Sequence, residues 1–242
     1  DLARMNKNFL VERNLPKDQL DSSSLRLSKY INKVVQNKED SIWIAQREGR
    51  SKDGNDQTAP GLLKMLSLSN EGNLIDHFRS LNIVPVTICY QFDPCGALKA
   101  RELRHLADFG EYCKAVNEDD NSMITGLLGN KGSIQINFNH SISNELEQFE
   151  TIRNKNELIR NISRLIDRHI YSNYTFWEGN YISYDLIFEE RFNDKYSPEN
   201  KIDFIEYLKE QAEKFSMNWE KGKDYLFEIY ANALNNQLNN NE

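Results

Sequence analysis

Several features are scarce in this sequence, and each shortage argues against a class of protein. Among 242 residues there are three cysteines, five prolines and eleven glycines. Three cysteines without a zinc-binding spacing argue against a disulfide scaffold and favour a reducing compartment. No apolar run approaches the roughly 18 residues that span a bilayer. A formal net charge of −7 argues against a general nucleic-acid binder, which would need a basic face.

What the sequence does contain, up to about residue 145, is an alternation of apolar runs and amphipathic stretches. The run at 83–90 is apolar throughout, which is typical of a parallel strand covered on both faces. The alternation predicts an α/β fold with a mostly parallel or mixed sheet flanked by helices. The expected strands lie at 9–11, 41–46, 83–90 and 133–139, and the expected helices lie at 17–36, after Pro60, before Asn82 and from Asp93 to Phe109.

The composition changes beyond residue 145. Apolar residues recur at helical spacing around 158–170, 205–215 and 225–233, while glycine and proline become rare. The Asn-rich end at 235–241 is expected to fray. The sequence therefore predicts a core domain at 1–145 followed by a helical extension at 146–242.

The most informative stretch is the cationic loop, which we define as residues 47–54. It reads Arg-Glu-Gly-Arg-Ser-Lys-Asp-Gly and follows the apolar run at 41–46. Arginine forks and a lysine charge suit phosphate oxygens, and glycine lets backbone N–H groups approach an anion. A solvated turn with local ion pairs is the other interpretation. The candidate binding residues in this loop are Glu48, Gly49, Arg50, Ser51 and Lys52.

Arg13 is a further candidate because it closes the first expected strand. If that strand and the strand at 41–46 are parallel neighbours, Arg13 and the cationic loop lie at the same sheet edge, where α/β folds place ligands. An arginine at a strand end is also common in surface ion pairs. Its significance here depends on its joining the loop.

Three blocks of this chain resemble a known family. Residues 9–13 (Phe-Leu-Val-Glu-Arg), 48–51 (Glu-Gly-Arg-Ser) and 84–88 (Val-Pro-Val-Thr-Ile) are similar, in order and approximate spacing, to blocks of the glycerolipid acyltransferases. These are the glycerol-3-phosphate and 1-acylglycerol-3-phosphate acyltransferases of the PlsB and PlsC type. The longer string at 42–54 resembles a bacterial branch described as putative acyltransferases. The resemblance covers roughly residues 1–140.

The resemblance implies a transfer of an acyl group from an acyl-CoA or acyl-carrier-protein thioester to a glycerol hydroxyl in phospholipid synthesis. Arg13 and Arg50 would bind the acceptor phosphate, Glu48 would stand in the acceptor site, and Pro85 would shape its wall. A general base would remove the hydroxyl proton, without a covalent acyl-enzyme. No metal and no bound cofactor is implied.

The sequence departs from the family pattern in two places. The family commonly has one more residue between the Glu-Gly pair and the arginine, whereas Gly49 runs directly into Arg50. The family's catalytic histidine stands in an H-x-x-x-x-D block upstream of the other blocks. No histidine here has aspartate five places on; the four are His77, His105, His140 and His169. We therefore expect the catalytic block upstream of Asp1, and this chain, which begins without Met, to be a piece that is inactive alone.

Other candidates have simpler structural interpretations. Cys95 at a helix start is expected to be a structural thiol, and the acidic run at 118–120 a solvated loop. The dense aromatics at 171–188 fit either helix packing or an acyl-chain or membrane contact.

The expected location is cytoplasmic, peripheral at the inner face of the cell membrane. The expected partners are the acyl donor, carrier protein included, and a phosphate-bearing acceptor, but not nucleic acid. Two rival functions stay open. The first is a non-catalytic protein that binds lipid or phosphate, and the second is an acyltransferase whose acceptor lacks phosphate.

Overall fold

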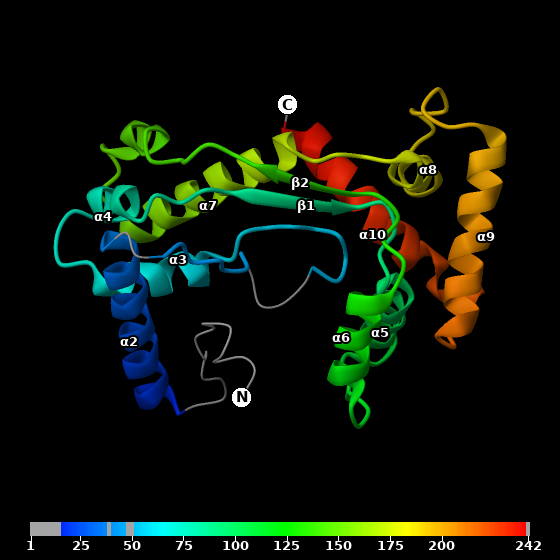
Figure 1. The fold of residues 1–242 in the computed structure, drawn as a ribbon, viewed down its shortest axis with the longest axis horizontal. Helices are drawn as coiled ribbons and strands as arrows, with labels where there is room; N and C mark the ends of the chain where they lie inside the picture. Colours follow the sequence, from blue (N-terminus) through cyan, green and yellow to red (C-terminus); the bar gives the residue numbers. More distant parts are fainter. Residues whose placement is uncertain (1–15, 38–39, 47–50, 241–242) are drawn as a thin grey trace. The chain divides into compact units, whose positions relative to one another are not determined.

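A computed structural model describes residues 16–37, 40–46 and 51–240 of the chain (Figure 1). Of these residues, 61% are helical and 5% lie in strands. The described strands are β1 (Val86–Tyr90) and β2 (Ile134–Phe138). The described helices are α2 (Lys17–Gln36), α3 (Pro60–Leu66), η1 (Ser67–Ser69), α4 (Leu74–Ser80), α5 (Gly96–Phe109), α6 (Glu118–Leu128), η2 (Glu145–Phe149), α7 (Lys155–Ser172), α8 (Glu178–Ile187), α9 (Pro198–Lys214) and α10 (Trp219–Asn240).

The α/β prediction is wrong for the described part of the chain. β1 and β2 pair antiparallel, with Ile88 opposite Ile136, and form a two-stranded sheet. Residues 41–46 are not a strand, and Trp43 in this stretch is 64% exposed. An apolar segment can be recognised in the sequence. The sequence pattern does not specify whether that segment forms a strand, or which other strand it pairs with. The strand expected at 9–11 lies outside the described residues.

The chain divides into two compact units, each built from segments on both sides of residue 145. The domain division expected at that residue stays a prediction. The first unit comprises residues 1–48, 58–84 and 141–166. The second unit comprises residues 49–57, 85–140 and 167–242, and it contains most of the features discussed below.

Around α3 and α4, the first unit holds a small helical core. Phe78 of α4 and Ile142 are fully buried, as is Ile159 in the first half of α7. Buried polar groups are satisfied locally: Ser28 Oγ of α2 donates to the carbonyl of Leu66 at 2.9 Å, and His77 Nε2 lies 2.9 Å from the same oxygen. Because an unsatisfied buried polar group is costly, these bonds favour a structural role for Ser28 and His77.

The second unit is organised around α10, which packs against α8 and α5 (Figure 1). Small residues allow close approach: Ala97 and Ala100 of α5 and Ala231 of α10 are almost completely buried. The amphipathic pattern expected for the C-terminal helices is confirmed, but α10 continues to Asn240 rather than fraying after residue 234. Fully or nearly buried apolar side chains from three elements complete this core: Ile182, Leu208 and Leu226.

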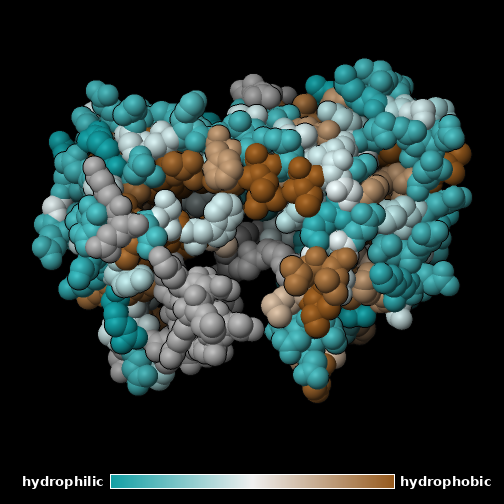
Figure 2. All heavy atoms as spheres, in the orientation of Figure 1, coloured by the Kyte–Doolittle hydropathy of each residue, from teal (hydrophilic) through white to brown (hydrophobic). Residues whose placement is uncertain are grey.

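The β1–β2 ribbon belongs to the second unit and has two unlike faces. On the inner face, Thr87 and Cys89 are buried, and the Cys89 sulfur accepts a hydrogen bond from the backbone N–H of Thr175. The outer face carries Ile88, Ile136 and Phe138, and Phe138 is 72% exposed. Figure 2 shows hydrophobic side chains gathered near the middle of the view, where Figure 1 draws the β1–β2 ribbon.

Two local expectations change at α5 and α6. The helix predicted from Asp93 to Phe109 begins three residues later, since α5 starts at Gly96 after Cys95. Asp93 Oδ1 instead accepts a hydrogen bond from the N–H of Cys95 at 2.8 Å, which stabilises the turn before the helix. The acidic run at 118–120 is not a loop but the first turn of α6, where carboxylates favour the positive end of the helix dipole.

Candidate functional site

Of the six residues predicted to bind the acceptor, the structure describes Ser51 and Lys52. Arg13, Glu48, Gly49 and Arg50 lie outside the described residues, so their convergence stays a prediction. The described end of the cationic loop and the three residues after it form one stretch, which we call the anchored segment (residues 51–57). It lies in the second unit and is held by side chains from distant parts of the sequence.

Inside the segment, Asp53 fixes the local turn. Its Oδ1 accepts hydrogen bonds from Ser51 Oγ at 3.1 Å and from the backbone N–H of Asn55 at 3.0 Å. Aspartate commonly bonds to the backbone two residues on, and it thereby replaces part of a regular turn. The hydroxyl of Ser51 therefore donates its hydrogen bond to Asp53.

The helix α10 holds the same segment by two asparagines. Asn232 Nδ2 donates to the carbonyl of Asp53 at 2.7 Å, and Asn236 Nδ2 donates to Oδ1 of Asn55 at 3.1 Å. These asparagines are four residues apart and so share one face of the helix. Because asparagine is a poor helix former, this pair at i and i+4 was a usable signal that a polar partner lies against α10.

At Gly54 the backbone of the segment touches α10. Gly54 has φ +73°, and a Cβ built there would lie 2.2 Å from the carbonyl oxygen of Ile229. Only glycine fits both the left-handed conformation and this approach. Gly54, the second glycine of the cationic loop, therefore has a packing role.

Asp56, near the end of the segment, accepts a hydrogen bond from the hydroxyl of Tyr174 at 2.9 Å. Burial and the nearby Asp56 charge together raise the pKa of Tyr174 far above its usual range, so the phenol stays protonated and remains a donor. Burial also raises the pKa of the Cys89 thiol, and Asp56 contributes to that shift. A thiol with a raised pKa is a poor nucleophile, which favours the structural interpretation of Cys89.

Lys52 forms an ion pair with Glu102 of α5. The Lys52 side chain is 43% exposed and that of Glu102 is 15% exposed, so the pair lies at the surface with its acid partly covered. A phosphate at Lys52 would share the ammonium group with Glu102, whose carboxylate would repel it. The cation is thus present where the sequence placed it, but it already has a carboxylate partner.

The electrostatic environment of the anchored segment is acidic. Asp53 and Asp56 lie in the segment, Glu102 pairs with Lys52, and burial together with Asp224 and Asp53 raises the pKa of Glu228 on α10. The charges of the described residues around this segment therefore do not favour an anion. The described part can fix the end of the loop, but it does not itself form a phosphate cradle.

No described helix is both long and apolar enough to cross a membrane. In the described ranges, no group of three or more His, Cys, Asp and Glu side chains is placed to hold a metal ion. His105 Nδ1 lies 2.9 Å from the carbonyl oxygen of Glu111, a local contact at the end of α5.

Comparisons of the chain with protein-family models, with curated proteins and with solved structures find no match.

Proposed function

We propose that this chain contributes the acceptor-binding loop of an acyltransferase that acylates a hydroxyl of a glycerol-phosphate-type acceptor. The proposal rests on the resemblance of residues 42–54 to the glycerolipid acyltransferases. Because residues 41–46 are not a strand, the sheet-edge argument for Arg13 no longer holds, and the role of Arg13 rests on the resemblance alone. The single observation in its favour is the anchoring of residues 51–57. The cationic stretch leads directly into a segment that α5, α10 and Tyr174 hold by hydrogen bonds and an ion pair.

Anchoring matters because a phosphate clamp works only when its donors are pre-positioned. A loop that orders on binding loses part of its interaction energy to entropy, whereas one fixed at its end loses less. In the proposed reaction the acceptor hydroxyl attacks the thioester carbonyl, the C–S bond breaks, and the thiolate leaves. A general base takes the hydroxyl proton. Arg50, with Arg13, holds the acceptor phosphate so that the hydroxyl reaches the carbonyl.

The test uses the full-length natural polypeptide and measures release of free CoA from acyl-CoA in the presence of glycerol 3-phosphate or 1-acylglycerol 3-phosphate. Replacing Arg50 by Ala removes a charge-assisted bond, which raises the KM for the phosphorylated acceptor about tenfold or more. The matched control is Arg168→Ala, an exposed arginine in the second half of α7. An unchanged KM in a folded Arg50→Ala protein would refute phosphate recognition by this loop.

A second function is favoured by one observation, the pairing of Lys52 with Glu102. If that pair persists, the loop has fewer free cations, and an acyltransferase for an acceptor without phosphate becomes the better description. The same assay with a panel of hydroxyl and amine acceptors separates the two functions. Absence of acyl transfer to every acceptor, with phosphate binding retained, would instead identify a non-catalytic lipid- or phosphate-binding protein.

A further inference from the structure

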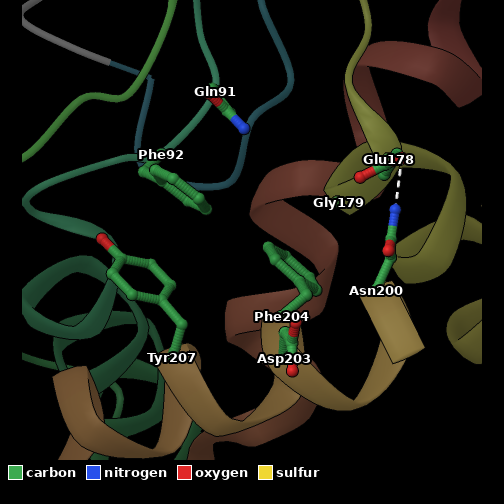
Figure 3. A pocket seen from close by; sticks show the side chains of 8 residues that line it. All are labelled: Gln91, Phe92, Glu178, Gly179, Asn200, Asp203, Phe204 and Tyr207. Atoms are coloured by element: carbon green, nitrogen blue, oxygen red, sulfur yellow. Dashed lines mark hydrogen bonds between the residues drawn. The ribbon is translucent and has the colours of Figure 1, made fainter.

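The second unit contains a pocket whose lining includes no residue of the anchored segment. It has a volume of about 240 Å³ and opens beside the first turn of α8, the adjoining face of α9 and the turn after β1 (Figure 3). Eight residues line it: Gln91, Phe92, Glu178, Gly179, Asn200, Asp203, Phe204 and Tyr207. The lining combines aromatic rings, amides and carboxylates, and contains no lysine or arginine.

Three aromatic rings form its apolar part. The ring centroids of Phe92 and Tyr207 lie 4.4 Å apart at an interplanar angle of 43°, and Phe204 is buried with its edge against Tyr230. Figure 3 shows the rings of Phe92, Phe204 and Tyr207 around a common space. Aromatic faces carry negative electrostatic potential and attract cations.

Gly179 keeps this arrangement open. A Cβ at Gly179 would lie 2.6 Å from Cε2 of Phe204, so any larger residue would push this ring out of its present position. Glycine at the second position of α8 costs helix stability. Here it allows the aromatic ring to lie against the helix backbone at the wall of the pocket.

Two carboxylates supply the charge of the rim. Glu178 accepts a hydrogen bond from Nδ2 of Asn200, drawn in Figure 3, which fixes its direction. Asp203, exposed on α9, has no hydrogen-bond or ion-pair partner within the described residues. The N-terminal turns of α8 and α9 contribute roughly half a positive charge each, less than the two full negative charges. The net field at the pocket therefore favours a cation.

We propose that this pocket binds a small organic cation that carries an ammonium group. The aromatic rings receive its methyl or methylene groups, and Glu178 and Asp203 neutralise its charge. Such a site is distinct in chemistry from the anion-binding loop of the proposed function, and neither proposal depends on the other.

The test uses the whole 242-residue chain, labelled with ¹⁵N, and two probes of the same shape. Choline carries a quaternary ammonium, and 3,3-dimethylbutan-1-ol is its neutral isostere. Choline is expected to shift the amide signals of Gly179, Phe204 and Tyr207 in a saturable manner. The neutral probe should bind at least fivefold more weakly, because it loses the cation–π and carboxylate attraction.

Two variants test whether the carboxylates at the rim of the pocket contribute to choline binding. Asp203→Asn and Glu178→Gln each remove a charge at an exposed position and should weaken choline binding about threefold to tenfold. Glu206→Gln makes the same charge change on α9 outside the pocket and should leave it unaltered. Equal affinity for the two probes, unchanged binding in both rim variants, or saturation of the same amides by inorganic phosphate instead of choline would each overturn the proposal.

Discussion

The hydroxyl of Tyr174 donates a hydrogen bond of 2.9 Å to Oδ2 of Asp56, across 118 positions of sequence. Tyr174 follows the end of α7, and Asp56 ends the stretch that begins with the cationic loop. The contact explains how residues with little secondary structure of their own are held in one conformation. Tyr174, with Asn232 and Asn236 of α10, therefore fixes the position of the anchored segment that follows the arginines of the loop.

Replacing Tyr174 by Phe should therefore loosen the anchored segment. The change removes one hydrogen bond to the partly buried Asp56 carboxylate, which costs about 1–3 kcal/mol of unfolding free energy. Chemical denaturation measures the loss, and hydrogen exchange at residues 51–57 should show where it falls. Tyr181→Phe is the matched control, since the Tyr181 hydroxyl has no hydrogen-bond partner among the described residues. Equal effects of the two changes would show that the bond contributes nothing specific.

Gly54 offers a separate test of the contact with α10. Gly54→Ala combines an unfavourable positive φ with a Cβ only 2.2 Å from the Ile229 carbonyl oxygen, and should cost more than about 3 kcal/mol. Gly110→Ala isolates the backbone cost, because Gly110 has φ +77° and no atom within 4 Å of its added Cβ. That control should lose about 1–2 kcal/mol. Thermal and denaturant unfolding measure the free energy of unfolding of both variants. A similar loss in the two would mean that Gly54 does not touch α10.

The pair between Lys52 and Glu102 leads to a prediction about binding. If Lys52 contributes to the acceptor site, Glu102→Gln releases its ammonium group and should lower the KM for a phosphorylated acceptor about twofold to fivefold in the full-length polypeptide. Stability should change by less than about 1 kcal/mol, because surface ion pairs contribute little. Glu111→Gln, an exposed acid just beyond α5, serves as the control. A raised or unchanged KM would assign Lys52 a structural role.

Buried tyrosines predict a loss of stability at alkaline pH. Burial, reinforced by the Asp93 charge, raises the pKa of Tyr207 to about 12, and burial raises the pKa of Tyr230 well above the ordinary tyrosine value of 10.0. Between pH 10 and about pH 12, the tyrosines of the unfolded chain lose protons that Tyr207 and Tyr230 retain in the folded chain. The stabilising contribution is thus complete below pH 10 and falls as pH rises towards 12.

Denaturant unfolding at intervals from pH 8 to 11.5 measures this slope. The Tyr207→Phe variant removes one of the titrating groups, so its free energy of unfolding should fall less steeply above pH 10 than that of the unaltered chain. Absorbance at 295 nm should show part of the tyrosine titration delayed beyond pH 11. Parallel slopes for the two proteins would contradict the assignment to Tyr207.

The outer face of the β1–β2 ribbon shows why the fold class was mispredicted. Ile134, Ile136 and Phe138 alternate as expected for a strand, and that strand is confirmed as β2. The covered, mostly parallel sheet is predicted instead from the continuous apolar run at 83–90, yet Ile88 in that run is 40% exposed and β1 pairs only with β2 among the described residues. Alternation reports that one face is apolar, and it does not report what, if anything, packs on that face.

The sequence by itself determined the local elements. Helical periodicity located α2, α7, α9 and α10, because the spacing of apolar side chains is a property of each segment alone. It also placed the cations of the loop and the absence of a histidine block. The tertiary structure alone decided strand pairing, the bond from Tyr174 to Asp56 and the neutralisation of Lys52 by Glu102. The Tyr174–Asp56 bond and the Lys52–Glu102 pair join residues 50 or more positions apart, and no local sequence pattern specifies which distant side chain a residue will contact.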